Sequence, residues 1–316
     1  MRQLRTSGVL YITLLLGAFV LPNTAWAGFV LGSNASQYAL LFEGAGANTL
    51  QITNVTINGN VGLGMTGKAT DSGPSTINGR IDFSAAEMSP SQFSNNNSGD
   101  VITGGVHFSV ATVTNALNDV NSLNTTLGSK AGTNIAINGS TTINATSGIS
   151  DLAGDRVFNV TAFSTTNSDI LTINGDGAGD SVVLNFNGLS ANFNNQVKLV
   201  GISSDQVLYN FVGGSGLTGG PTLQINDNLS NNTPNCSLGQ YCVQGVFLDP
   251  NGAISVTNAN VVGRVFGGDT HDFQYVSGSN ITATGSPVPE PKNIFLLIGF
   301  GIAIALAASR RKLSRS

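Results

Sequence analysis

The chain has 316 residues, of which 41% are hydrophobic and only 9% are charged, and its formal net charge at pH 7 is −4. Residues 28–286 contain six Lys and Arg against sixteen Asp and Glu, a balance of −10. Because nucleic acids and anionic lipids bind to positive patches, this acidic and weakly charged stretch argues against both as partners. The 259 residues of this stretch are enough for a large single core or two small domains.

Residues 1–27 have the layout of a secretory signal peptide. Arg2 and Arg5 precede an apolar stretch at 9–21, and Ala25 and Ala27 place small residues at both positions that a signal peptidase reads. Cleavage before residue 28 is therefore expected. The alternative, an N-terminal membrane anchor, is less favoured because the apolar stretch is short for a membrane span.

Short apolar segments bounded by Asn-Gly or Gly-Gly recur along residues 28–286 and indicate a mainly β fold. The motif Thr-Ile-Asn-Gly occurs at 56–59, 76–79 and 172–175, with a shorter Ile-Asn-Gly at 137–139 and looser relatives at 101–106 and 261–265. Each copy is interpreted as a strand, a corner and another strand. The spacing predicts an irregular right-handed β-solenoid. A sandwich of β-hairpins remains the alternative, since Asn-Gly also favours hairpin turns.

One segment has helical rather than strand periodicity. Between Ser109 and Leu127 the apolar residues recur every three or four positions, and Gly128 can end the helix. The opposite face is mostly Thr, Asn and Ser. These features predict one amphipathic helix packed along the β body. A membrane-surface role is not expected, because the polar face carries no basic residue.

Residues 28–286 contain few groups that could bind a metal or take part in catalysis. Asp176 and Asp180 flank a Gly-rich segment that could hold Ca²⁺, although a plain turn is the simpler interpretation. Asp269 and His271 belong to the densest polar cluster, for which a surface turn is favoured over a metal site. No motif of a hydrolase, zinc protease or phosphate-binding loop is present. We therefore expect no catalytic residues, no metal and no cofactor.

The two cysteines, Cys236 and Cys242, are six positions apart. In an exported protein they are expected to form one disulfide that closes a small loop. A zinc site is disfavoured because no histidine lies nearby in sequence.

The C-terminal residues 287–316 form a third region with three parts. Val288, Pro289, Glu290 and Pro291 come first, and an apolar segment at 293–309 follows as a predicted transmembrane helix. The basic tail at 310–316 comes last, and its cluster is Arg310, Arg311 and Lys312. This cluster should stay on the cytoplasmic side, which places the residues before the apolar segment on the extracytoplasmic side. The apolar segment is only marginally long enough to span.

This C-terminal arrangement resembles the PEP-CTERM sorting signal of Gram-negative bacteria. The resemblance implies that an exosortase-type enzyme recognises Pro289, Glu290 and Pro291 and cleaves nearby. It implies a transient stay in the inner membrane, followed by release to the cell surface or the extracellular space. An ordinary C-terminal anchor is the alternative.

Residues 28–286, the body of the chain, carry a second resemblance, which rests on shorter motifs. An early Asn-Gly-x-Val-Gly segment, the predicted helix, and late segments at 246–250 and 262–268 look like the choice-of-anchor A domain, with His271 and Phe273 following. The arrangement is also similar to bacterial ice-binding β-solenoids, which pair such coils with one helix.

The leading functional hypothesis is a non-enzymatic surface or matrix protein associated with exopolysaccharide in a biofilm. The alternative is ice binding by one solenoid face, which we expect to require Thr-x-Thr on successive coils. Thr-x-Thr occurs only at 112–114, in the predicted helix, and at 282–284, which we assign to the linker. A polysaccharide-active enzyme is the third possibility, disfavoured because few charged residues are available for a catalytic groove.

Overall fold

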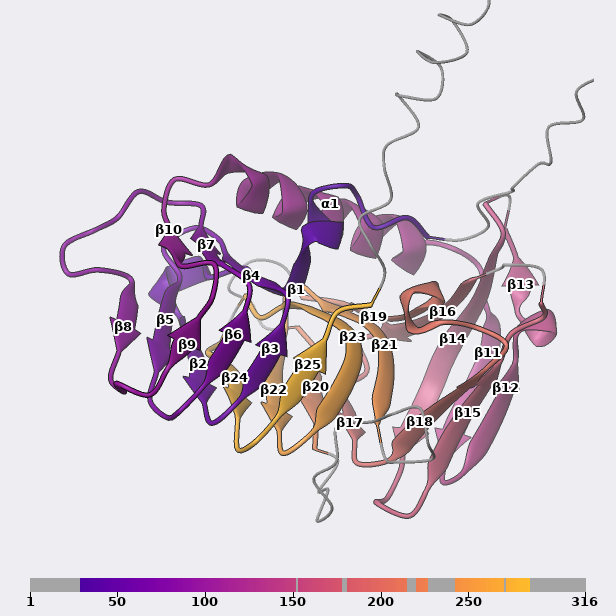
Figure 1. Ribbon diagram of the computed structural model, residues 1–316. Helices are drawn as coiled ribbons and strands as arrows, with labels where there is room; N and C mark the ends of the chain where they lie inside the picture. The colour runs from indigo at the N-terminus through magenta and orange to yellow at the C-terminus, as the bar shows by residue number, and fades with distance from the viewer. Residues whose placement is uncertain are drawn as a thin grey trace, which may run out of the picture.

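The computed structural model describes residues 29–284, except for 152, 178–180, 215–219, 227–241 and 270. The predicted signal peptide, the sorting motif with its apolar segment and basic tail, Cys236 and Asp180 therefore lie outside the described residues. Within them, parallel strands wind into a solenoid along which one long helix is packed (Figure 1). No helix in this part of the chain is long and apolar enough to cross a membrane.

The first half of the solenoid winds outward from the middle of the molecule. It begins with the short 3₁₀ helix η1 (Ala35–Gln37) and contains a second one, η2 (Ala45–Ala47). Its strands are β1 (Tyr38–Phe42), β2 (Thr49–Thr53), β3 (Thr56–Asn58), β4 (Asn60–Leu63), β5 (Lys68–Asp71), β6 (Thr76–Asn78), β7 (Ile81–Phe83), β8 (Phe93–Asn95), β9 (Val101–Ile102) and β10 (Val106–His107).

The helix α1 (Ala111–Gly128) then connects β10 at one end of the solenoid with β11 at the other (Figure 1). From there the second half winds back, with 3₁₀ helices η3 (Ala145–Ser147) and η4 (Ser204–Gln206). Its strands are β11 (Thr133–Asn138), β12 (Thr141–Asn144), β13 (Ile149–Ser150), β14 (Asp155–Ser164), β15 (Ile170–Asn174), β16 (Ser181–Asn187), β17 (Ala191–Phe193), β18 (Gln196–Val200), β19 (Val207–Val212), β20 (Thr222–Ile225), β21 (Val243–Asp249), β22 (Ala253–Thr257), β23 (Asn260–Gly267), β24 (Phe273–Val276) and β25 (Asn280–Thr282).

The strands form three faces. The face covered by α1 has the order β10-β7-β4-β1-β23-β21-β19-β16-β14-β11, and the second face has the order β17-β20-β22-β24-β2-β5-β8. The third face contains β9-β6-β3-β25-β23 toward one end and β12-β15-β18 toward the other. The last coils therefore close against the first, because β23 pairs with β1, and β24 pairs with β2.

The solenoid prediction is confirmed, and the alternative of a hairpin sandwich is wrong. Among the described strand pairs only β13 with β14 is antiparallel, whereas hairpins would make neighbouring strands antiparallel throughout. The predicted irregularity is also present. The described segments that join β11 to β12 and β14 to β15 contain no strand on the second face, so these coils have two sides rather than three.

Glycine corners explain why the Asn-Gly motif recurs. At 56–61 the motif runs from β3 through Gly59, which has a φ of 142°, into β4. A Cβ on the stacked Gly79 would lie 2.4 Å from the Gly59 carbonyl oxygen. Only glycine lets the backbones of successive coils approach this closely. The copy at 261–265 differs from the expected strand-corner-strand, because it is a bend at Gly263 inside the single strand β23.

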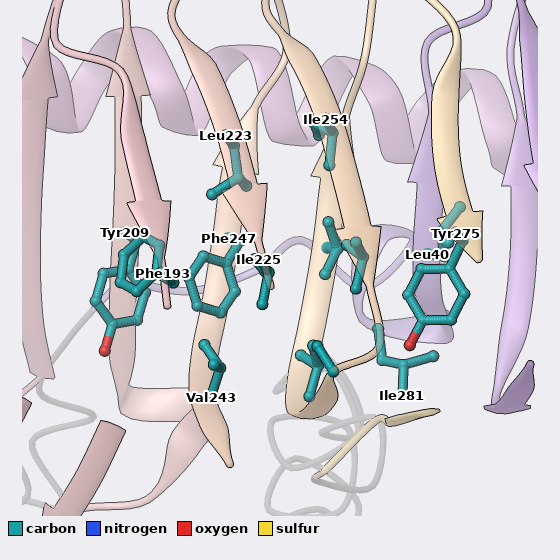
Figure 2. Packing of buried hydrophobic residues seen from close by; sticks show 14 of the residues in the cluster. Leu40, Phe193, Tyr209, Leu223, Ile225, Val243, Phe247, Ile254, Tyr275 and Ile281 are labelled. Carbon is teal, nitrogen blue, oxygen red and sulfur yellow. The ribbon is translucent and has the colours of Figure 1, made fainter. Parts of the chain in front are cut away.

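The core lies inside the coils, where alternate residues of every strand point inward. Tyr209 and Phe247 stack at a centroid distance of 4.5 Å, and Phe193 meets both rings edge-on (Figure 2). Aliphatic side chains such as Leu223 and Ile254 continue the stack along the solenoid axis (Figure 2). Each coil thus buries its apolar side chains against the next coil.

The predicted amphipathic helix is confirmed, with a shifted start. It begins at Ala111 rather than Ser109, because Ser109 has a φ of 60°, outside the right-handed helical region. Gly128 is the last helical residue, and Ser129 caps the end. Val113, Val120 and other apolar residues of α1 form a second core with side chains of the covered face.

One polar contact joins α1 to that face. Asn124 is 5% exposed, and its Nδ2 donates to Asn210 Oδ1 and to the Phe211 carbonyl, both at 2.8 Å. Asn210 in turn donates to Asn185 Oδ1 at 2.9 Å, and Asn185 donates to the carbonyl of Leu127 at 2.9 Å. This network satisfies polar groups between the helix and two neighbouring strands, and it fixes the position of the helix on the sheet.

Candidate ligand-binding faces

The third face presents columns of Thr and Asn side chains, and we call its β23, β25, β3, β6 and β9 part the Thr/Asn face. Its strands lie side by side in Figure 1, at a repeat of about 4.8 Å. The inward residues, such as Ile57 and Ile281, are fully buried, so the residues on either side of them point outward. By register, the first column is Asn260, Asn280, Thr56, Thr76 and Val101, and the second is Val262, Thr282, Asn58 and Asn78. Asn260, at the edge of the first column, is buried.

Side-chain hydrogen bonds order these columns. Asn78 Nδ2 donates to Asn58 Oδ1 at 2.7 Å, and Asn58 Nδ2 donates to Thr282 Oγ1 at 3.1 Å. In the other column Asn280 Nδ2 donates to Asn260 Oδ1 at 2.8 Å. Since Thr is stiff at χ1 and the amides hold one another, the face presents a fixed array of polar groups. The parts of the five strands that form this face carry no charged residue, since Arg264 of β23 lies beyond the bend at Gly263 and is buried.

The second face presents a different column, and we call it the Gln/Ser face. The register places seven outward residues opposite one another from β17 to β8. They are Asn192, Gln224, Ser255, Gln274, Gln51, Thr70 and Ser94. Gln51 and Gln274 are long and flexible, and the exposed residues Lys68 and Asp272 flank the column. This face is therefore flanked by charge, unlike the Thr/Asn face, and its long Gln side chains lose more conformational entropy when they are fixed.

Several carboxyl groups are buried beneath the faces. Burial raises the pKa of Glu43 to about 7, although a hydrogen bond from Asn121 of α1 partly offsets it. Burial also raises the pKa of Asp71 to about 6 and that of Asp249 to about 8. These groups are buried in the body, with Glu43 under α1, so they influence stability rather than the chemistry of the outer faces.

The structure places the sequence-predicted polar sites as follows. Asp269 is buried and its backbone carbonyl accepts a hydrogen bond from Asn48 at 3.0 Å, whereas His271 is exposed. Asp176 accepts a hydrogen bond from Arg156 at 3.1 Å. Cys242 is disulfide-bonded. In the described ranges no three His, Cys, Asp or Glu residues come together as a metal-binding group.

One sequence assignment needs correction. Thr282 is the last residue of β25 and lies on the Thr/Asn face, so 282–284 is not a linker. Thr284 is also part of the body, since its hydroxyl donates to Asp205 Oδ1 at 3.0 Å and its carbonyl accepts from Arg264 at 2.9 Å. A Thr-x-Thr pattern does not describe the Thr/Asn face, because β3 and β6 carry Thr-x-Asn and their neighbour β25, far away in sequence, carries Asn-x-Thr.

Solved structures similar to this one include ice-binding proteins. One from an Arctic yeast matches with a TM-score of 0.50 at 14% identity, covering 83% of this chain and 97% of the yeast chain. The structure of its glycosylated form matches with a TM-score of 0.50 at 14% identity, covering 82% of this chain and 96% of the yeast chain. The ice-binding protein of the Antarctic ascomycete Antarctomyces psychrotrophicus has a TM-score of 0.49 at 16% identity, and the match covers 82% of this chain and 100% of the ascomycete chain. At this identity the likeness to the yeast structures shows a shared fold, a β-solenoid with one packed helix.

No protein-family model matches the chain. No curated protein matches it either. The resemblances to the PEP-CTERM signal and to the choice-of-anchor A domain therefore stay predictions from sequence.

Proposed function

We propose that this chain is a non-enzymatic adhesive β-solenoid that binds ice through its Thr/Asn face. The observation that carries the proposal is the register of two uncharged Thr and Asn columns, ordered by the bonds from Asn78 to Asn58 and from Asn58 to Thr282. The fold shared with the yeast ice-binding protein supports it.

The physical reason is preorganisation. Ice is an extended lattice, so a binding surface must present many weak contacts at a regular spacing at the same time. Columns repeat at about 4.8 Å across the strands and at about 6.6 Å along each strand, which is two residues. Because the side chains are already held in place, little conformational entropy is lost on binding. The Thr methyl groups and the amides can together order a layer of water that joins the lattice.

The test is thermal hysteresis measured on the purified protein, with two matched variants. Thr56 and Thr70 are both half-buried, outward residues. Thr56 lies in β3, the middle strand of the Thr/Asn face, and Thr70 lies in β5, the strand next to the edge strand β8 of the Gln/Ser face. We expect Thr56→Lys to abolish most of the thermal hysteresis, because a long charged side chain breaks the array. Thr70→Lys, on the Gln/Ser face, should retain it. Absence of activity in the unmodified protein, or equal loss in both variants, would contradict the proposal.

The Gln/Ser face favours exopolysaccharide as a second candidate partner. Its seven in-register polar residues offer hydrogen-bond donors and acceptors along the solenoid axis without a dominant charge. Co-sedimentation with the polysaccharide of the producing cells tests this, and here the roles of the two variants reverse. Thr70→Lys should weaken binding while Thr56→Lys retains it. Binding that is insensitive to Thr70→Lys would exclude this face.

The proposal includes the export and sorting expected from the two ends of the chain. The protein would leave the cytoplasm through its signal peptide, stay briefly in the inner membrane, and reach the cell surface after cleavage by an exosortase-type enzyme. Fractionation of cells that produce the full chain tests this step. Glu290→Gln should leave the protein in the inner membrane, whereas Lys292→Gln, just outside the Pro-Glu-Pro motif, should be released like the unmodified chain.

A further inference from the structure

A lysine and two aspartates meet where α1 ends and the second half of the solenoid begins. Lys130 follows the helix, Asp151 follows β13, and Asp155 is the first residue of β14. The Lys130 Nζ donates to Asp151 Oδ2, and it also donates to Asp155 Oδ2 at 2.9 Å. The lysine nitrogen is thus in direct contact with one carboxyl group while a second one faces it.

The Asp151 carboxyl group is held in a specific orientation. Its Oδ1 accepts hydrogen bonds from the backbone N–H of Ala153 at 2.9 Å and of Asp155 at 2.8 Å. Two N–H donors on one oxygen would stabilise negative charge developing there, as in an oxyanion hole. The other oxygen, Oδ2, faces Lys130 and can act as the leaving group.

Asp155 is placed to accept a proton. It is 1% exposed, its Oδ1 accepts a hydrogen bond from the Ser181 hydroxyl, and its Oδ2 accepts one from the Lys130 Nζ. A buried carboxylate beside an ammonium group can take a proton from it and return that proton later. The cluster therefore contains a nucleophile, an electrophile, an oxyanion site and a proton acceptor.

We propose that Lys130 and Asp151 become joined by an intramolecular amide bond. Asp155 removes a proton from the Lys130 ammonium, and the neutral Nζ attacks Asp151 Cγ to form the N–C bond. Negative charge collects on Oδ1, where the two N–H groups stabilise it. The bond from Cγ to Oδ2 then breaks, and this oxygen leaves as water with one proton from Nζ and one from Asp155. Lys-NH₃⁺ and Asp-COO⁻ thus give an amide and one water, with no other reactant.

The resting state before the reaction is an ion pair. Burial by itself lowers the pKa of Lys130, but its hydrogen bonds to the two aspartates raise the pKa overall. Burial alone raises the pKa of Asp151, but the Lys130 hydrogen bond lowers it overall. The amide forms from the minor neutral state, and because the groups are held in contact, one slow event per molecule suffices. The bond would tie the end of α1 to the segment between β13 and β14.

Trypsin digestion of the unfolded, reduced full chain tests the proposal. Arg80, Lys130 and Arg156 are consecutive trypsin sites. With a free Lys130, trypsin releases peptides 81–130 and 131–156 separately, each at its sequence mass. With the amide, trypsin cannot cut after Lys130, and one species covering 81–156 appears. Its mass is lower by one water than the mass calculated from the sequence of the uncleaved peptide 81–156. We expect the single species, and recovery of the two separate peptides overturns the proposal.

Three variants assign the roles. Lys130→Arg keeps the positive charge and the trypsin site but lacks a reactive amine, so it should give two peptides. Asp155→Asn keeps both partners but removes the proton acceptor, and it too should give two peptides. Asp169→Asn changes an exposed aspartate elsewhere and should give the single linked species. A linked species from Asp155→Asn would show that Asp155 is not the proton acceptor.

Discussion

The buried amide network between α1 and the sheet offers a direct measure of how the helix is held. Replacing Asn124 with Ala removes the donor to Asn210 Oδ1 and to the Phe211 carbonyl, both of which lie beneath the helix. Each buried acceptor left without its donor costs about 1 to 3 kcal/mol. Taking the middle of that range for two acceptors and allowing for partial relaxation, we expect Asn124→Ala to lose about 3 kcal/mol. For a domain of this size the melting temperature should fall by about 6 to 12 °C.

The measurement is urea unfolding followed by far-UV circular dichroism, with Asn118→Ala as the control. Asn118 is an exposed residue of the same helix, and its replacement should change stability by no more than about 0.5 kcal/mol. A double-mutant cycle with Asn210→Ala should give a coupling energy of at least about 0.5 kcal/mol. If Asn124→Ala and Asn118→Ala had equal effects, the network would not be what fixes the helix.

Two further predictions concern the coils. Gly263→Ala should cost at least about 3 kcal/mol or prevent folding, because its Cβ would lie 1.9 Å from the Gly245 carbonyl oxygen. Gly278→Ala, whose φ is 78° and whose Cβ would meet nothing within 4 Å, should cost only about 1 to 2 kcal/mol; equal losses in thermal unfolding would refute the close-approach argument. The second prediction concerns Glu43, whose pKa is raised to about 7 from 4.5. The folded state then keeps a proton that the unfolded state has lost, so its contribution to the free energy of unfolding falls as pH rises from about 4.5 to about 7. Glu43→Gln should remove that contribution from the pH profile measured by urea unfolding, and an unchanged profile would contradict it.

Sequence patterns predicted those elements of this protein that depend on residues close to one another in the chain. The apolar spacing at 109–127 identified the helix, because one face of a helix is a property of consecutive residues. The Thr-Ile-Asn-Gly motif identified the corners of the solenoid, because only glycine tolerates the backbone contact between Gly79 and Gly59.

Contacts between distant segments could not be predicted in this way. The Thr282 hydroxyl accepts from Asn58 although 224 positions separate them, and no pattern near either residue indicates the other. The same holds for Asn124 and Asn210, which are 86 positions apart and belong to elements of different type. Thr/Asn columns and the helix-sheet network both arise from strand order, which a list of motifs does not contain.

The sequence by itself thus determined a β-solenoid of glycine corners with one packed helix, because each of these depends on neighbouring residues. Only the tertiary structure decided that the first strand, β1, lies in the middle, that the coils wind outward from it, and that the chain crosses along α1 and returns so that β25 lies beside β3. The physical reason is that parallel strands satisfy their hydrogen bonds equally well with many partners. Which partner is chosen depends on how the whole chain closes, and that closure places the Thr and Asn side chains in register on one face.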